Sequence, residues 1–167
     1  MYNFLVLNKL YVEDGPQEKM TFIDSQKQPY VVLSILSPEW GLNGVQLPKE
    51  LIFCKAHKTF LFHDVTERGD VNSLKPVTLP IVPISEVHAK EIIDFVFKWK
   101  DRVNQFIIHC EAGLSRSPAV ALALSEILNG SETKFANFIE TLYDINQHNI
   151  SVKQKILTTY KEEYEKA

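Results

Sequence analysis

The sequence lacks three features that would each indicate a particular class of protein. It has only two cysteines, Cys54 and Cys110, which is too few for a disulfide framework and favours a reduced, cytoplasmic setting. No apolar run approaches the roughly 20 residues that a membrane-spanning helix needs. The chain also shows no internal repeat and no low-complexity tract. We therefore expect a soluble globular protein.

Clustered positive charge is also scarce. The formal net charge is −3, and no two Lys or Arg residues are adjacent. The tightest basic cluster, formed by Lys98, Lys100 and Arg102, is short and interrupted. A protein surface that binds nucleic acid or an anionic membrane usually carries a denser cluster of Lys and Arg residues. We expect no nucleic acid and no membrane among the partners, and a monomer.

The length of 167 residues suits a single domain covering residues 1–167. Runs rich in β-branched and aromatic residues predict strands, because such side chains fit a pleated, half-buried surface. The predicted strands are Asn3–Asn8, Tyr30–Leu36, Thr59–His63 and, more weakly, Leu51–Lys55. Residues 66–84 contain three prolines and predict a long irregular segment.

Helical patterns dominate the second half of the chain. Ser85 is a good N-cap for a helix whose apolar residues recur with helical spacing. Phe106–His109 reads as a short buried strand, and a second helix follows from Ser117-Pro118 to Asn129-Gly130. Two further apolar stripes predict helices over residues 135–142 and 152–164. The pattern indicates an α/β fold with a central mixed or parallel sheet flanked by helices.

The junction between the inner strand and the next helix reads H-C-E-A-G-L-S-R-S-P, from His109 to Pro118. Backbone N–H groups at a helix N-terminus favour an anion, and the loop between them can surround a phosphate. The loop residues expected to bind phosphate are Glu111, Ala112, Gly113, Leu114, Ser115 and Arg116. Gly113 allows a positive φ and a close approach to the ligand.

Two side chains of this loop carry the expected chemistry. Arg116 offers a planar pair of donors that matches two phosphate oxygens. A helix N-terminus and a nearby cation favour the thiolate form of a cysteine, so Cys110 is the candidate nucleophile. His109 is expected to make an internal hydrogen bond that orients the loop.

The segment His109–Ser117 matches H-C-x-x-G-x-x-R-S and so resembles the signature of the protein tyrosine phosphatase superfamily. The length of the chain and the place of the signature make it similar to the compact dual-specificity branch. The resemblance implies a reaction without metal or cofactor, in which Cys110 attacks phosphorus and Arg116 binds the equatorial oxygens. It also implies that Ser117 helps the cysteine to leave and that an aspartate protonates the leaving oxygen.

Two residues are named candidates for that acid, and a water or another carboxylate is the remaining alternative. Asp64 follows the strand run T-F-L-F-H-D, which is the context that the resemblance implies, but it lies 46 residues before Cys110. That is a longer separation than in relatives, so Asp70 is the alternative. A turn-forming role is the competing interpretation of both residues, and it is the stronger one for Asp70 beside Gly69.

Three functions remain open on the sequence. The first is a phosphatase for phosphotyrosine, with weaker action on phosphoserine and phosphothreonine, on protein or peptide substrates. The second is a phosphate-binding module without turnover, and the third is a phosphatase for a non-protein ester. Glu111, as an acidic loop residue, argues against a polyphosphorylated substrate. Cys54 is expected in the core, with capture of oxidised Cys110 as a minority hypothesis.

Overall fold

The protein is built around a parallel β-sheet. The computed structural model describes residues 2–7, 19–66, 71, 73, 75–78, 80–111, 115–130 and 148–165. Within them, four strands lie in the order β1-β4-β2-β3, and every neighbouring pair is parallel. The strands are β1 (Asn3–Leu7), β2 (Tyr30–Leu36), β3 (Cys54–Leu61) and β4 (Gln105–His109). The α/β prediction is confirmed, with β4 as an inner strand.

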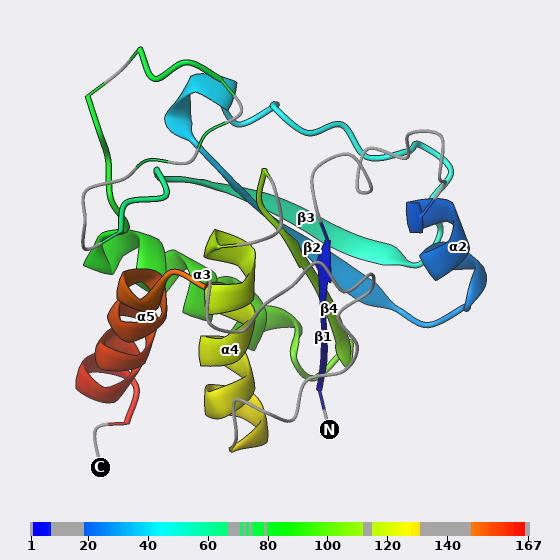
Figure 1. Ribbon diagram of the computed structural model, residues 1–167. Helices are drawn as coiled ribbons and strands as arrows, with labels where there is room; N and C mark the ends of the chain where they lie inside the picture. Colours follow the sequence, from blue (N-terminus) through cyan, green and yellow to red (C-terminus); the bar gives the residue numbers. More distant parts are fainter. Residues whose placement is uncertain are drawn as a thin grey trace.

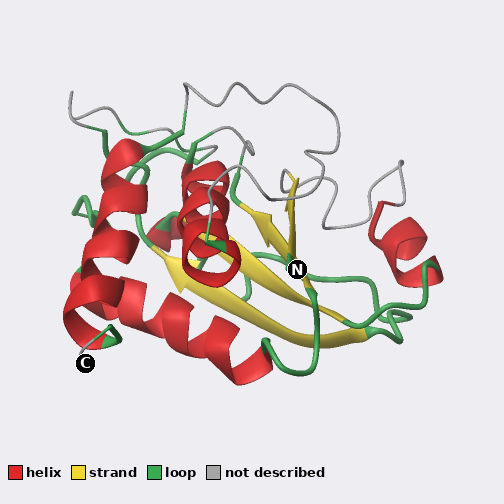
Figure 2. Ribbon diagram, turned by 90° about the horizontal axis from the view of Figure 1, so that it is seen from below, coloured by secondary structure: helices red, strands yellow, loops and turns green. Residues whose placement is uncertain are grey.

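Helices cover both faces of this sheet (Figure 1). One face packs against α3 (Glu86–Trp99), α4 (Arg116–Asn129) and α5 (Ile150–Glu163). The other face packs against the short helix α2 (Lys19–Ser25), and the 3-10 turn η1 (Pro38–Trp40) follows β2 on this side. Figure 2 shows the sheet between these layers. All seven residues of β2 are buried, as expected for a strand covered on both faces.

The two-residue period of the strands assigns side chains to the two layers. Phe4 and Val6 contact the core under α3, α4 and α5, whereas Leu5 and Leu7 contact the core under α2. The same alternation on β4 directs Cys110 toward the three-helix side. The nucleophile candidate thus lies on the face from which α4 begins.

The predicted helix boundaries agree with the structure to within two residues. Ser85 caps α3, since its Oγ accepts a hydrogen bond from His88 N at 3.3 Å. Gly130 ends α4 in the left-handed conformation, with φ of 74°. The last predicted helix is α5, and its last helical residue is Glu163. The start of α4 differs, because the helix begins at Arg116 rather than at Ser117-Pro118.

Other predictions differ from the structure or lie outside it. One strand, β3, includes the end of the weak candidate Leu51–Lys55 and the start of the predicted strand Thr59–His63; residues 51–53 and 62–63 lie outside it. Helix α2 was not predicted; it carries Asp24, which accepts hydrogen bonds from the backbone of Ile52 and Phe53. The stripe over residues 135–142 lies outside the described residues. No helix in the described ranges is long and apolar enough to cross a membrane.

Candidate active site

The candidate site lies at the edge of the sheet where β2, β3 and β4 end. Parallel strands point the same way, so the segments that follow them emerge together. Residues 37–40 follow β2, residues 62–64 follow β3, and Cys110 and Glu111 follow β4. Side chains from all three segments contact one another, as the next paragraphs describe. The sheet topology therefore assembles the site from distant parts of the sequence.

Cys110 lies at the end of β4, and its side chain is almost fully buried. Ser117, in the first turn of α4, donates a hydrogen bond from Oγ to the cysteine Sγ at 3.2 Å. Both residues lie where α4 begins, at the positive end of the helix dipole. The two residues that the resemblance pairs in catalysis are thus in direct contact.

Arg116, the first residue of α4, reaches back beneath the strand ends. Its Nη1 donates to the carbonyl of Phe62 at 2.8 Å and to Ser37 Oγ at 3.2 Å. Its Nη2 donates to Glu111 Oε2 at 2.9 Å. These contacts connect the guanidinium to the segments after β2, β3 and β4, which fixes its position at the centre of the site.

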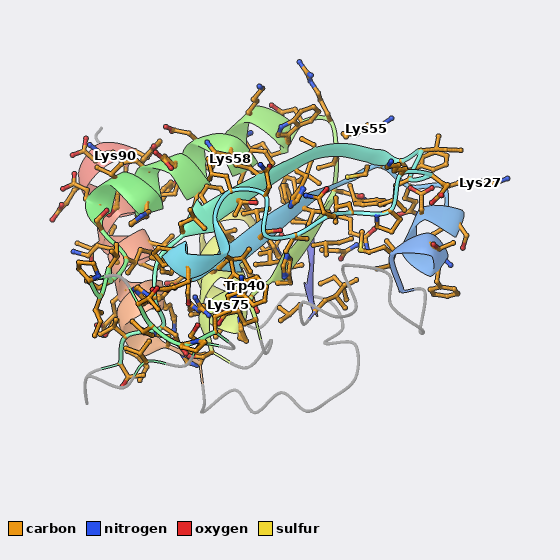
Figure 3. All side chains as sticks on the ribbon, turned by 90° about the horizontal axis from the view of Figure 1, so that it is seen from above. Lys27, Trp40, Lys55, Lys58, Lys75 and Lys90 are labelled. Atoms are coloured by element: carbon orange, nitrogen blue, oxygen red, sulfur yellow. The ribbon has the colours of Figure 1, made fainter. Side chains whose placement is uncertain are left out.

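The carboxylate of Glu111 is turned into the protein. Besides the ion pair with Arg116, its Oε1 accepts hydrogen bonds from Trp40 Nε1 and, at 3.4 Å, from Ser73 Oγ. Trp40 in turn lies beneath Lys75, whose Nζ is 4.2 Å from the indole centroid (Figure 3). The negative charge of Glu111 is therefore paired inside the protein. The sequence-based argument that this charge disfavours a polyphosphorylated substrate no longer holds.

Asp64 is 1% exposed and contacts Ser115, the residue before α4. Its Oδ1 accepts hydrogen bonds from Ser115 Oγ and from Asn149 Nδ2, each at 2.7 Å. The structure thus brings the first acid candidate next to the residue that precedes Arg116. Asp70, the alternative, lies outside the described residues, as do Ala112, Gly113 and Leu114 of the loop.

His63, beside Asp64, holds the segment after β3 in place. Its Nδ1 accepts a hydrogen bond from the backbone N–H of Val82 at 2.8 Å, so this nitrogen carries no proton. Its Nε2 therefore donates to Glu39 Oε1 at 2.7 Å. The other oxygen of Glu39 accepts from Thr78 N at 3.1 Å. Glu39 and His63 thereby connect η1 to the segment that precedes α3.

His109 makes the internal hydrogen bond that the sequence predicts. Its Nδ1 donates to the carbonyl of Cys110 at 3.0 Å, because a carbonyl only accepts. Its Nε2 lies 2.5 Å from Ser34 Oγ, which lies 2.7 Å from Nε2 of His57. A polar chain thus crosses from β3 through β2 to the backbone of Cys110. Burial lowers the pKa of His57, which favours the neutral ring.

Cys54 does not lie near Cys110. It pairs with Tyr30 at the start of β2, and Tyr30 pairs with Gln105 at the start of β4. Cys110 follows five residues later, which is about 16 Å along the strand direction, whereas a disulfide needs Cα atoms within about 7 Å. Burial also raises the pKa of the Cys54 thiol to about 11. The geometry contradicts the hypothesis that Cys54 captures an oxidised Cys110.

Sequence reasoning missed several residues of the site. Trp40 and Glu39 lie in a stretch that reads only as turn chemistry, and Asn149 precedes a predicted helix. An Asn residue just before a predicted helix is typical of an N-cap, so the sequence indicates a capping role for Asn149. Its contact with Asp64 was not visible, since 85 residues separate the two.

The fold was compared with known proteins. No family model and no curated protein matches the sequence. The human tyrosine phosphatase-like serine/threonine/tyrosine-interacting protein has a similar structure, with a TM-score of 0.59 and 12% identity over 97% of this chain and 93% of that chain. PTPMT1 in complex with PI(5)P is also matched, with a TM-score of 0.47 and 11% identity over 96% of this chain and 91% of that chain.

The match with the tyrosine phosphatase-like protein covers nearly the whole of both chains. At 12% identity it is evidence about fold, and the fold it shows is an α/β sheet flanked by helices. The signature His109–Ser117 lies at the junction of the inner strand β4 and helix α4. The fold is thus similar to that of the tyrosine phosphatase-like protein, and the protein tyrosine phosphatase superfamily stays the prediction that the signature His109–Ser117 makes.

Proposed function

We propose that this chain is a cysteine-dependent phosphatase that hydrolyses phosphate monoesters, phosphotyrosine in proteins or peptides foremost. The observation that carries the proposal is the contact of Ser117 Oγ with Cys110 Sγ at 3.2 Å, at the N-terminus of α4 and beside the buried Arg116. A hydroxyl donor, the positive end of a helix dipole and a guanidinium all favour a bound phosphate. A cysteine with a purely structural role needs none of these three.

In the first step, Cys110 Sγ attacks phosphorus and forms the S–P bond. The bond between phosphorus and the leaving oxygen breaks, and the leaving oxygen takes a proton from Asp64. Arg116 donates hydrogen bonds to the equatorial phosphate oxygens as their charge rises. The products of this step are the free alcohol or phenol and phosphocysteine.

In the second step, water attacks phosphorus and the S–P bond breaks. Asp64, now a carboxylate, accepts the proton from the attacking water. Cys110 leaves as a thiolate, and the Ser117 hydroxyl stabilises it through the contact already present. Inorganic phosphate is released, and the enzyme returns to its starting protonation state without a cofactor.

The direct test is hydrolysis of a phosphotyrosine peptide in the presence of EDTA and a reducing agent. We expect turnover by the native chain, complete loss in Cys110→Ser, and loss of about 100-fold or more in Arg116→Lys, since lysine lacks the paired donors. Cys54→Ser is the matched control and should keep native activity. Turnover that survives in Cys110→Ser would overturn the proposal.

A phosphate-binding module is the second candidate, and one observation favours it. The guanidinium of Arg116 already donates to Phe62, Ser37 and Glu111, so it has protein partners in this structure. If these contacts persist on ligand binding, Arg116 donates less to the equatorial oxygens, so the chain would bind phosphopeptide more weakly and would not turn it over. Phosphopeptide binding by native protein with no release of phosphate from any ester would favour this function.

The substrate class is tested by a panel of esters. The charge of Glu111 is paired with Arg116, and the cation of Lys75 lies over Trp40 near the loop. An additional acidic group on the substrate would therefore not be repelled by Glu111. We still propose phosphotyrosine peptides as the preferred class, on the family resemblance. Faster turnover of phosphoinositides or of another non-protein ester than of phosphopeptides would overturn that preference.

A further inference from the structure

The side chain of Asn149 connects three parts of the site. Asn149 is 3% exposed and lies at the N-cap of α5, where its Oδ1 accepts a hydrogen bond from Val152 N at 3.1 Å. This contact fixes the orientation of the amide, because only the oxygen can accept. The Nδ2 group must then face the opposite side, where Asp64 Oδ1 lies at 2.7 Å and the carbonyl of Val65 at 3.0 Å.

The backbone of Asn149 contacts the phosphate loop as well. Its N–H donates to the carbonyl of Ser115 at 3.0 Å. Ser115 in turn donates from Oγ to Asp64 Oδ1 at 2.7 Å. The three residues therefore form a closed set of hydrogen bonds, in which Asp64 is fixed relative to the loop that binds the phosphate.

The set also decides which oxygen of Asp64 carries a transferable proton. Oδ1 accepts two strong hydrogen bonds, from an amide and from a hydroxyl. A proton on Oδ1 would compete with both donors, whereas a proton on Oδ2 would leave both hydrogen bonds in place. Asn149 therefore orients the carboxyl group as well as holding it.

Helix α5 gives this arrangement a rigid support. Asp64 lies on a segment outside any helix or strand, whereas α5 is anchored in the core through Val152 and Ile156. We propose that Asn149 is a positioning residue for the proposed reaction, which fixes Asp64 so that its Oδ2 proton reaches the leaving oxygen. The inference rests on the proposed function. It adds that the proposed reaction depends on helix α5, because α5 holds Asn149 in place.

Two substitutions separate this role from the capping role. Asn149→Asp is nearly isosteric, and Asn149→Ser is smaller. Both remain good N-caps, because their oxygens can still accept from Val152 N. Both lose the Nδ2 donor to Asp64. Asn149→Ser adds no charge, so its thermal unfolding should change little and its effect on catalysis can be measured separately. Asn149→Asp places a second carboxylate against the buried Asp64, so it should also lower the unfolding temperature.

The experiment compares esters with different leaving groups. An aryl phosphate with an acidic phenol, such as p-nitrophenyl phosphate, needs little protonation, whereas phenyl phosphate and phosphotyrosine need it strongly. We expect both variants to lower kcat about 10- to 100-fold on phenyl phosphate and much less on p-nitrophenyl phosphate. Asp64→Asn should show the same dependence, and combining it with Asn149→Ser should add nothing. Binding of vanadate, which has no leaving group, should not change.

Three outcomes are distinguishable. Loss that grows with the basicity of the leaving group, with unchanged vanadate binding, supports the inference. Equal loss on all esters, or weaker vanadate binding, shows a structural role for Asn149 and overturns the inference while the proposed function stands. A native chain that hydrolyses neither class of ester overturns the proposed function and this inference together.

Discussion

Glu111 and Arg116, five residues apart in the phosphate loop, form an ion pair of 2.9 Å in which each side chain is only 2% exposed. The loop thus supplies its own partner for the arginine that is expected to bind phosphate. Because Trp40 also donates to this carboxylate, the position of Arg116 depends on the segment after β2.

Replacing Glu111 should destabilise the protein and misplace Arg116. Glu111→Ala leaves a buried guanidinium without its counter-charge, so we expect a loss of about 3–5 kcal/mol in the free energy of unfolding. Urea unfolding measures this loss. Glu111→Gln is the matched control; its single amide oxygen can replace the acceptor for either Arg116 or Trp40 but not for both, so it should lose less stability than Glu111→Ala. Equal stability of native and Glu111→Ala protein would show that the ion pair contributes nothing.

Oxidation should not join the two cysteines. The register of the sheet puts Cys54 and Cys110 at opposite ends, and the pKa of Cys54 is raised to about 11 by burial. Peptide mapping after mild peroxide should therefore show oxidised Cys110 and unmodified Cys54. Iodoacetamide at neutral pH should likewise label Cys110 faster. A Cys54–Cys110 disulfide in the monomer would contradict the described geometry.

Stability should fall in mild acid. Burial lowers the pKa of His57 and His88 in the folded protein, while the unfolded chain has ordinary histidine pKa values near 6.5. Below about pH 6.5 the unfolded state then binds protons that the folded state does not, so the free energy of unfolding decreases as pH falls. Urea unfolding at about pH 7.5 and about pH 5.5 measures this change.

The control for the pH effect is a pair of variants, His57→Gln and His88→Gln. Glutamine cannot titrate, so each variant should show a shallower pH dependence than the native protein. His57→Gln also keeps an N–H donor for Ser34, which limits the disturbance of the chain to His109. An unchanged slope in both variants would assign the effect to other groups.

Much of the fold follows from local sequence patterns. The apolar strand β2 and the capped helix α3 carry strong periodic signals, and both were predicted with correct bounds or caps. Helix α2 was missed because it is short and has no charged residues that complement its dipole. The start of α4 was placed too late because Pro118 reads as the first helical residue, whereas the helix begins at Arg116.

Only the residues of the candidate site that lie close together in the sequence could be predicted. Cys110, Arg116 and Ser117 lie in one short segment, so the loop could be recognised from spacing. The contacts of Asp64 with Asn149 and of Glu111 with Trp40 span 85 and 71 residues. Such contacts arise from the order of the strands and from the packing of α5, which no local pattern encodes.

The central claim is that phosphate passes through Cys110. Ser117→Ala removes the hydroxyl that contacts the sulfur, so it should slow the departure of the thiolate and let phosphocysteine accumulate. The measurement is an acid quench of this variant with a phosphotyrosine peptide, followed by mass spectrometry of the peptide that contains residue 110. The account predicts a phosphate group on Cys110, absent in Ser117→Ala/Cys110→Ser. Release of phosphate by the native chain with no phosphorylated Cys110 at any quench time in Ser117→Ala would contradict it.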